Sequence, residues 1–224
     1  MVSLDDIEKI FKQRNWWDLL FNLRISKYIT YYVANHTELT PNQVTMMSFV
    51  LAIFSGIAFY EHAFIIGALL FQLSYIFDIV DGALARVKGI STKYGAFLDV
   101  FTDWLKAPVL IIILLYIQGD IFLLIVTLLL LMWSCCANKY NDMLFYTEKK
   151  SLTQSDEISM SRIGQYFKYM KERHIIELPG TIEFEALILF LYPITQQSIF
   201  LYLALLLLFG TFLLKVYIIV KKLR

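Results

Sequence analysis

Six long apolar segments constrain this chain more than any other feature of its sequence. A helix needs about 20 predominantly apolar residues to cross a bilayer, and irregular backbone cannot satisfy its hydrogen bonds there. Hydrophobic residues make up 58% of the 224 residues, and mean hydropathy is +0.62. We therefore expect an all-α integral membrane protein with six transmembrane helices, at residues 43–60, 63–84, 95–117, 120–140, 180–195 and 197–219. The fifth segment is the weakest, because Glu183 and Glu185 lie near its start.

The N-terminal segment has a different pattern. Residues 3–36 alternate polar and apolar side chains at helical period, with Trp16 and Trp17 close to basic residues such as Arg24 and Lys27. This pattern is typical of an amphipathic helix in the membrane interface; a helix packed on protein is the alternative. We expect residues 1–40 to form this juxtamembrane segment. Residues 41–224 then form the transmembrane domain, with a cytoplasmic loop at about 141–178.

The distribution of Lys and Arg predicts the orientation. Apart from Lys106 inside the third span, these residues fall in 9–27, 86–93, 139–173 and 215–224, whereas the turns near 60–63, 118–120 and 193–198 contain none. Because cytoplasmic loops carry an excess of Lys and Arg, we expect both termini to lie in the cytoplasm, at the cell membrane. The net charge of +1 says nothing about nucleic acid, but no basic stripe with interleaved aromatics is present, so we expect no nucleic acid partner.

Four aspartates lie at the border of the second and third predicted spans. Asp78 and Asp81 are three residues apart, and Asp99 and Asp103 are four apart. Both spacings put the carboxylates on one face of a helix. Carboxylates at a membrane border are costly unless they meet a cation or line a wet cavity. The two pairs can therefore converge on one or two Mg²⁺ or Mn²⁺ ions, which suit phosphate chemistry.

The residues between the aspartates fit the same chemistry. Gly82 and Gly95 remove side chains where a nucleotide or a neighbouring helix must come close. Arg86 offers a planar cation for a diphosphate. The alternative is that the carboxylates cap helices and pair with Arg86, Lys88 and Lys93. Four carboxylates at helical register, with glycines between them, disfavour that alternative.

The whole pattern, D-x₂-D-G-x₂-A-R-x₈-G-x₃-D-x₃-D, resembles the defining motif of the CDP-alcohol phosphotransferases. All its fixed positions are met, by Asp78, Asp81, Gly82, Ala85, Arg86, Gly95, Asp99 and Asp103. The resemblance extends to the amphipathic start and the six spans. It implies that a hydroxyl attacks the β-side phosphate of a CDP-linked alcohol and releases CMP. It also implies two bound divalent ions and a homodimer.

The resemblance assigns roles by motif position. Metal ligation is implied for Asp78, Asp81, Asp99 and Asp103, the last of which is also the general base. Contacts with the CDP moiety are implied for Asp81, Gly82, Ala85 and Arg86. Members similar to phosphatidylinositol-phosphate synthases add a hydroxyl residue six positions after the Arg, which is Thr92 in this chain. The start of the first span resembles a further nucleotide-binding segment, through Asn42 and Thr45.

The substrates are less determined than the reaction. CDP-diacylglycerol and CDP-archaeol fit equally as lipid donors, and the acceptor is a small polar alcohol. Trp104 stands where inositol-phosphate users commonly have Arg, which weakens that acceptor. Lys106 and Lys139 are candidates for binding an anionic acceptor; lysines that extend to the headgroups are the alternative.

Two other classes of protein place carboxylates in membranes. Intramembrane prenyltransferases use two aspartate clusters with Mg²⁺, but their clusters have different spacing. Ion-coupled transporters usually carry their membrane carboxylates near the midplane, and they are built of paired halves with interrupted helices. The aspartates of this chain lie at one border, and no halves match.

Overall fold

The computed structural model describes residues 2–11, 15–148 and 181–223, and within them the chain is helical with no strand. The N-terminal part holds α1 (Leu4–Ile10), the π-helical turn η1 (Asp18–Asn22) and α2 (Leu23–His36). Four long helices follow, α3 (Pro41–Tyr60), α4 (Phe64–Lys88), α5 (Lys93–Ile117) and α6 (Ile121–Glu148). The C-terminal part holds α8 (Thr181–Ala186), the π-helical turn η2 (Leu187–Leu191), α9 (Tyr192–Thr195) and α10 (Ile199–Leu223).

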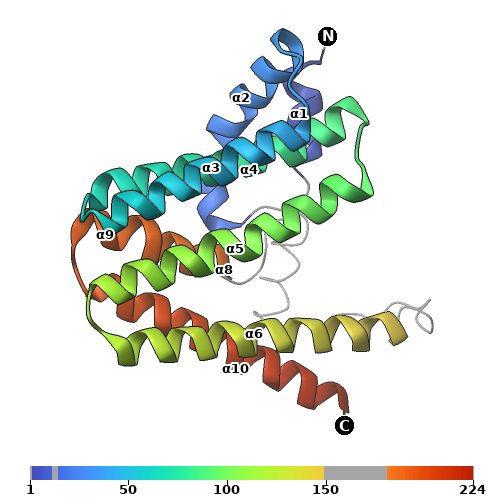
Figure 1. Ribbon diagram of the computed structural model, residues 1–224. Helices are drawn as coiled ribbons and strands as arrows, with labels where there is room; N and C mark the ends of the chain where they lie inside the picture. Colours follow the sequence, from blue (N-terminus) through green and yellow to red (C-terminus); the bar gives the residue numbers. More distant parts are fainter. Residues whose placement is uncertain (1, 12–14, 149–180, 224) are drawn as a thin grey trace.

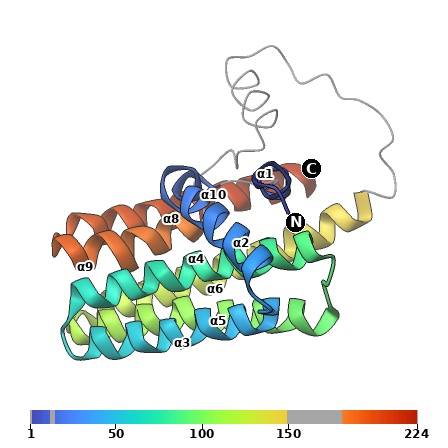
Figure 2. The same cartoon turned by 90° about the horizontal axis from the view of Figure 1, so that it is seen from above.

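The long helices run along one another, and α2 crosses them at an angle (Figures 1 and 2). α3 packs on α4 and α5, and α6 packs on α10. The α3–α4, α5–α6 and α9–α10 turns lie at one end of the bundle; the α4–α5 turn and the ends of α6 and α10 lie at the other (Figure 1). The turns that lack Lys and Arg therefore share one end, as the predicted topology requires. The side of the membrane that each end faces stays a prediction.

Four helical segments among the described residues are long and apolar enough to cross a membrane. They are α3, α4, α5 and residues Ile199–Tyr217 of α10, and they match the first, second, third and sixth predicted spans. The fourth predicted span lies in α6, whose described apolar part is the shorter Ile121–Trp133. The fifth is divided among α8, η2 and α9, with Pro193 in the last of these. Six spans therefore remain a prediction.

Part of the predicted cytoplasmic loop is helical. α6 continues to Glu148, so the first residues of the segment predicted as a loop, 141–148, extend this helix. The rest of that segment, 149–178, lies outside the described residues.

Local sequence signals fix the helix ends around the aspartates. α3 begins at Pro41, with Thr40 as N-cap: the Gln43 backbone N–H donates to the Thr40 hydroxyl, and the Thr40 N–H donates to Gln43 Oε1 at 2.8 Å. α4 ends at Gly89, whose φ of 65° is in the left-handed region that favours glycine. Thr92 then caps α5. The two aspartate-bearing helices are thus joined by a turn of a few residues.

Small residues and hydroxyls hold α3 against α4. Ser48 Oγ donates to the Ser74 carbonyl at 2.9 Å, and Ser74 Oγ donates back to the Ser48 carbonyl at 2.8 Å. Ser55 Oγ donates to the Gly67 carbonyl at 2.7 Å. Gly67 also lies against the ring of Phe59. Small residues and interhelical hydrogen bonds of this kind stabilise helix pairs in membranes, where apolar burial offers little.

The N-terminal segment is divided rather than continuous. The predicted helix over 3–36 is instead α1, η1 and α2, and residues 12–14 are outside the described part. It buries four polar residues, Asp18, Asn22, Ser26 and Thr30, together with the apolar Ile7 and Val33. Its exposed side chains include the apolar Leu20, Phe21, Ile25, Tyr28 and Tyr32. Apolar side chains that face outward suit a lipid environment, and placement in the interface stays a prediction.

Candidate functional site

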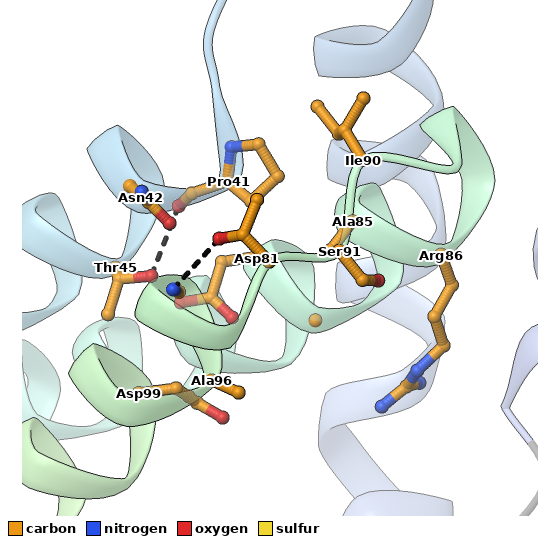
Figure 3. A pocket seen from close by; sticks show the side chains of 13 residues that line it. Pro41, Asn42, Thr45, Asp81, Ala85, Arg86, Ile90, Ser91, Ala96 and Asp99 are labelled. Atoms are coloured by element: carbon orange, nitrogen blue, oxygen red, sulfur yellow. Dashed lines mark hydrogen bonds between the residues drawn. The ribbon is translucent and has the colours of Figure 1, made fainter.

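A cavity of about 200 Å³ opens where α3 begins, α4 ends and α5 begins (Figure 3). We call it the Arg86 cavity. Its lining is Pro41, Asn42, Thr45, Asp81, Gly82, Ala85, Arg86, Ile90, Ser91, Thr92, Gly95, Ala96 and Asp99. All seven residues that the sequence predicts to contact a nucleotide are among them. The structure brings these residues together, and their roles remain predictions.

The wall of the Arg86 cavity depends on one close approach. A Cβ atom on Gly95 would lie 2.8 Å from Asn42 Oδ1 and 3.1 Å from Thr92 Oγ1, which is too close for any side chain without movement. At Gly82 a Cβ would meet the Arg86 guanidinium at an ordinary 3.5 Å. Thr92 Oγ1 also accepts from the Gly95 backbone N–H at 2.9 Å. Gly95 therefore sets the spacing between α3 and α5 beside the cavity.

Three of the four predicted metal ligands converge. Asp78 on α4 and Asp99 and Asp103 on α5 each offer a carboxylate oxygen, and these oxygens all lie within 4.8 Å of one another. Asp81, one turn along α4 from Asp78, is outside this group. Its side chain is 3% exposed, and its Oδ2 is buried without a hydrogen-bond partner among the described residues.

Lys106 contacts this group of aspartates directly. Its Nζ lies 2.9 Å from Asp103 Oδ1 and also donates to Asp78 Oδ1. A third hydrogen bond goes to Ser48 Oγ, at 3.1 Å. From the sequence we expected Lys106 either to bind the acceptor or to extend to the headgroups. In the structure its ammonium instead pairs with the carboxylates of Asp78 and Asp103. The three-residue spacing from Asp103 was the signal that could have indicated this pair.

A second and larger cavity, of about 630 Å³, shares no lining residue with the first. We call it the Lys106 cavity. Its polar lining is Ser74, Tyr75, Asp78, Asp103, Trp104, Lys106, Thr181 and Glu185. No sequence pattern indicated Tyr75 or Thr181 as site residues, and Glu185 was considered only as a weakness of the fifth predicted span. The four aspartates are thus divided between two cavities: Asp81 and Asp99 line the first, and Asp78 and Asp103 line the second.

A buried polar network connects the N-terminal segment to α4, whose residues line part of the Lys106 cavity. Asn22 donates to Asp18 Oδ1 at 2.9 Å and accepts from Gln72 of α4. Burial raises the pKa of Asp18, and hydrogen bonds from Asn22, Tyr75 and Asn15 partly oppose that rise. Tyr75 is shared, because it also lines the Lys106 cavity. η1 is therefore held to α4 less than two turns from Asp78.

The residues present fit a hard divalent cation. Carboxylate oxygens are the ligands that Mg²⁺ and Mn²⁺ prefer, and three of them already converge. The orphaned Oδ2 of Asp81 supplies a further buried acceptor without a protein donor in the described part. Lys139, the other lysine considered for an acceptor, lies in α6, and its side chain is outside the described residues.

Comparison with known proteins adds a family and a fold. A model of the family CDP-alcohol phosphatidyltransferase matches residues 38–219. The chain is 36% identical over 83 residues to the bifunctional IPC transferase and DIPP synthase of Aquifex aeolicus, a match that covers 37% of this chain and 18% of that protein. It is 35% identical over 68 residues to the archaetidylinositol phosphate synthase of Pyrococcus horikoshii, covering 30% of this chain and 36% of that protein. The matched stretches thus span well under half the length of these relatives.

Solved structures share the fold. A crystal structure of the Mycobacterium tuberculosis phosphatidylinositol phosphate synthase with CDP-DAG bound superposes with a TM-score of 0.51 at 21% identity, covering 87% of this chain and 92% of that one. Another structure of that synthase, in complex with manganese and citrate, gives 0.51 at 19% identity, covering 86% and 87%.

Proposed function

This chain belongs to the CDP-alcohol phosphatidyltransferase family, whose model matches residues 38–219, and from that premise we propose its reaction. It transfers a phosphatidyl or archaetidyl group from a CDP-linked lipid to the hydroxyl of a small polar alcohol, and it releases CMP. The reaction belongs to phospholipid biosynthesis and depends on a divalent metal.

One observation carries this proposal: the four aspartates line two separate cavities, two in each. An in-line displacement at phosphorus needs the leaving group and the attacking hydroxyl on opposite sides of the reacting phosphate. We assign the Arg86 cavity to the cytidine diphosphate part of the donor, because every residue with a predicted nucleotide contact lines it. We assign the Lys106 cavity, which shares no lining residue with the Arg86 cavity, to the acceptor.

The Arg86 cavity suits a diphosphate by charge and by shape. Arg86 can offer two parallel N–H donors to phosphate oxygens. Gly82 leaves open space beside the Arg86 guanidinium, and Gly95 lets Asn42 and Thr92 lie close to the backbone of α5. Asn42 and Thr45, from the first turns of α3, close the opposite wall. The donor's acyl or isoprenoid tails would then extend into the bilayer beside the bundle.

Asp103 is placed to act as the general base. It lines the Lys106 cavity and is exposed, so an acceptor hydroxyl can reach its carboxylate. In the proposed step the hydroxyl proton passes to Asp103, and the hydroxyl oxygen forms a bond to the lipid-side phosphorus. The bond from that phosphorus to the CMP oxygen breaks, and CMP leaves.

We propose that Asp78, Asp81, Asp99 and Asp103 hold two divalent ions, Mg²⁺ or Mn²⁺. The convergence of three carboxylates within 4.8 Å supports this, as does manganese in a synthase of the same fold. Such ions neutralise the charge that develops on the phosphate oxygens and on the leaving group.

Two further parts of the proposal come from the family resemblance and from the charge distribution. We propose that the enzyme is a homodimer, and that the site and both termini face the cytoplasm. The second part is supported by the placement at one end of the bundle of the α4–α5 turn, which lines the Arg86 cavity, and of the ends of α6 and α10 (Figure 1). Each of these belongs to a segment rich in Lys and Arg.

A donor and acceptor panel tests the function. Purified protein would be incubated with CDP-diacylglycerol or CDP-archaeol, with serine, glycerol phosphate, inositol or inositol phosphate as acceptor, and CMP would be measured by chromatography. Inositol phosphate is included because the names of the relatives specify inositol phosphate products. CMP release that requires one lipid donor and one acceptor supports the proposal. No release with any lipid donor contradicts it.

A further inference from the structure

Lys106 places a positive charge inside the group of aspartates. Its ammonium bonds to Asp78 and Asp103, from two different helices, and to Ser48 on a third. The residue is only 9% exposed. Lysine side chains are almost never buried unless they are paired, and this one is paired twice.

The charge balance of the cluster explains why a cation is needed there. Three carboxylates with oxygens within 4.8 Å repel one another strongly in a partly desolvated site. Buried charges require a counter-ion. Among the described residues, the aspartates of the cluster form two ion pairs, and Lys106 is the partner in both. It therefore compensates part of the charge before any metal is bound.

The same contacts put the Lys106 ammonium in competition with a divalent ion for the carboxylates of Asp78 and Asp103. Asp78 and Asp103 direct carboxylate oxygens at the Lys106 ammonium. A divalent ion that bridged these two aspartates would need those lone pairs. The ammonium and such an ion cannot both occupy the space between them, since two cations in contact repel.

We propose that Lys106 is a built-in counter-cation: it positions Asp78 and Asp103 in the metal-free protein, and a divalent cation displaces it. This inference rests on the metal site of the proposed function. The displaced ammonium stays in the Lys106 cavity, which it already lines. Lys106 is then a positioning residue, and metal binding releases its charge into the space assigned to the acceptor.

Metal affinity is the first test. Lys106→Met keeps an unbranched side chain and removes the charge, so Mn²⁺ should bind about tenfold more tightly than to the wild type, since one competing charge is gone. The EPR signal of free Mn²⁺, titrated with purified protein in detergent, measures this. Lys88→Met is the matched control, because the Lys88 ammonium donates to the Leu39 carbonyl at 3.2 Å, away from the cluster. It should bind Mn²⁺ as the wild type does.

The wild type provides a second test that does not depend on whether the variant folds. Reductive methylation followed by peptide mass spectrometry reports how accessible each lysine is. Saturating Mn²⁺ should raise the methylation of Lys106 several-fold and leave that of Lys88 unchanged. Unchanged methylation of Lys106 on metal saturation would contradict displacement.

The outcomes separate this inference from the proposed function. Mn²⁺ that binds the wild type and Lys106→Met with equal affinity overturns the counter-cation role and leaves the metal site standing. A wild type that binds no Mn²⁺ overturns both. Tighter binding in Lys106→Met, with Lys88→Met unchanged, supports both.

Discussion

Gly95 of α5 approaches Asn42 of α3 so closely that a Cβ atom on the glycine would lie 2.8 Å from Asn42 Oδ1. Both residues line the Arg86 cavity. The contact therefore couples the packing of two helices to the width of the site proposed for the nucleotide.

Gly95→Ala should weaken donor binding. The added methyl group must displace the Asn42 amide or the Thr92 hydroxyl, both of which line the cavity. We expect the KM for the CDP-lipid donor to rise about tenfold, equivalent to about 1.4 kcal/mol, with little change in the KM for the acceptor. Initial rates of CMP release at varied donor concentration measure the effect. An unchanged donor KM would remove this contact from the donor site.

Asp103→Asn should abolish turnover while donor binding remains. The amide cannot accept the hydroxyl proton, and loss of a general base typically costs about 10²–10⁴-fold in rate. CMP release gives the rate, and calorimetric titration with a non-reacting CDP-lipid analogue gives the affinity. A rate like that of the wild type in this variant would exclude Asp103 from the mechanism.

Gly67→Ala should destabilise the α3–α4 pair. A Cβ on Gly67 would lie 2.4 Å from Phe59 Cδ1, and Phe59 is fully buried. Overpacking of this kind costs about 1–3 kcal/mol, so the Tm in detergent should fall by several degrees. Gly210→Ala is the control, since nothing lies within 4 Å of its Cβ position. Both glycines are helical, and equal Tm values for the two variants would contradict the account of α3–α4 packing.

Much of this site could be predicted because its signals are local. The Thr40-Pro41 start of α3 and the three- and four-residue spacings of the aspartates depend on neighbours within one or two turns. The seven residues with predicted nucleotide contacts come from three helix ends, and all of them line one cavity.

The contacts that were missed join residues far apart in sequence. The bonds of Lys106 to Ser48 and Asp78 span 58 and 28 positions, and the bond from Gln72 to Asn22 spans 50. Periodicity does not encode such pairs. It also did not predict the π-helical turns η1 and η2, which divide two segments that were expected to be single helices.

Asp18 should make stability depend on pH. Burial raises the pKa of this carboxyl above its ordinary value of 3.8. The folded protein then holds the proton more tightly than the unfolded chain. The stability that this carboxyl contributes is therefore present at low pH and is lost as pH rises through the folded pKa. Asp18→Asn removes this titrating group. As pH falls from 7 to 4, the Tm of the wild type should therefore increase relative to the Tm of the variant.

Thermal unfolding in detergent across that range measures the difference, and titrations common to both proteins cancel. A Tm difference that does not change with pH would show that the Asp18 carboxyl is not perturbed as its burial requires.

Metal dependence of CMP release tests the central claim most directly, namely that the convergent aspartates carry out transfer from a CDP-linked lipid with divalent ions. Purified protein, donor and acceptor would be assayed in excess chelator, and again after Mg²⁺ or Mn²⁺ is restored above the chelator concentration. We predict no CMP in chelator and full release on restoration of either ion. Full CMP release in excess chelator would contradict the account.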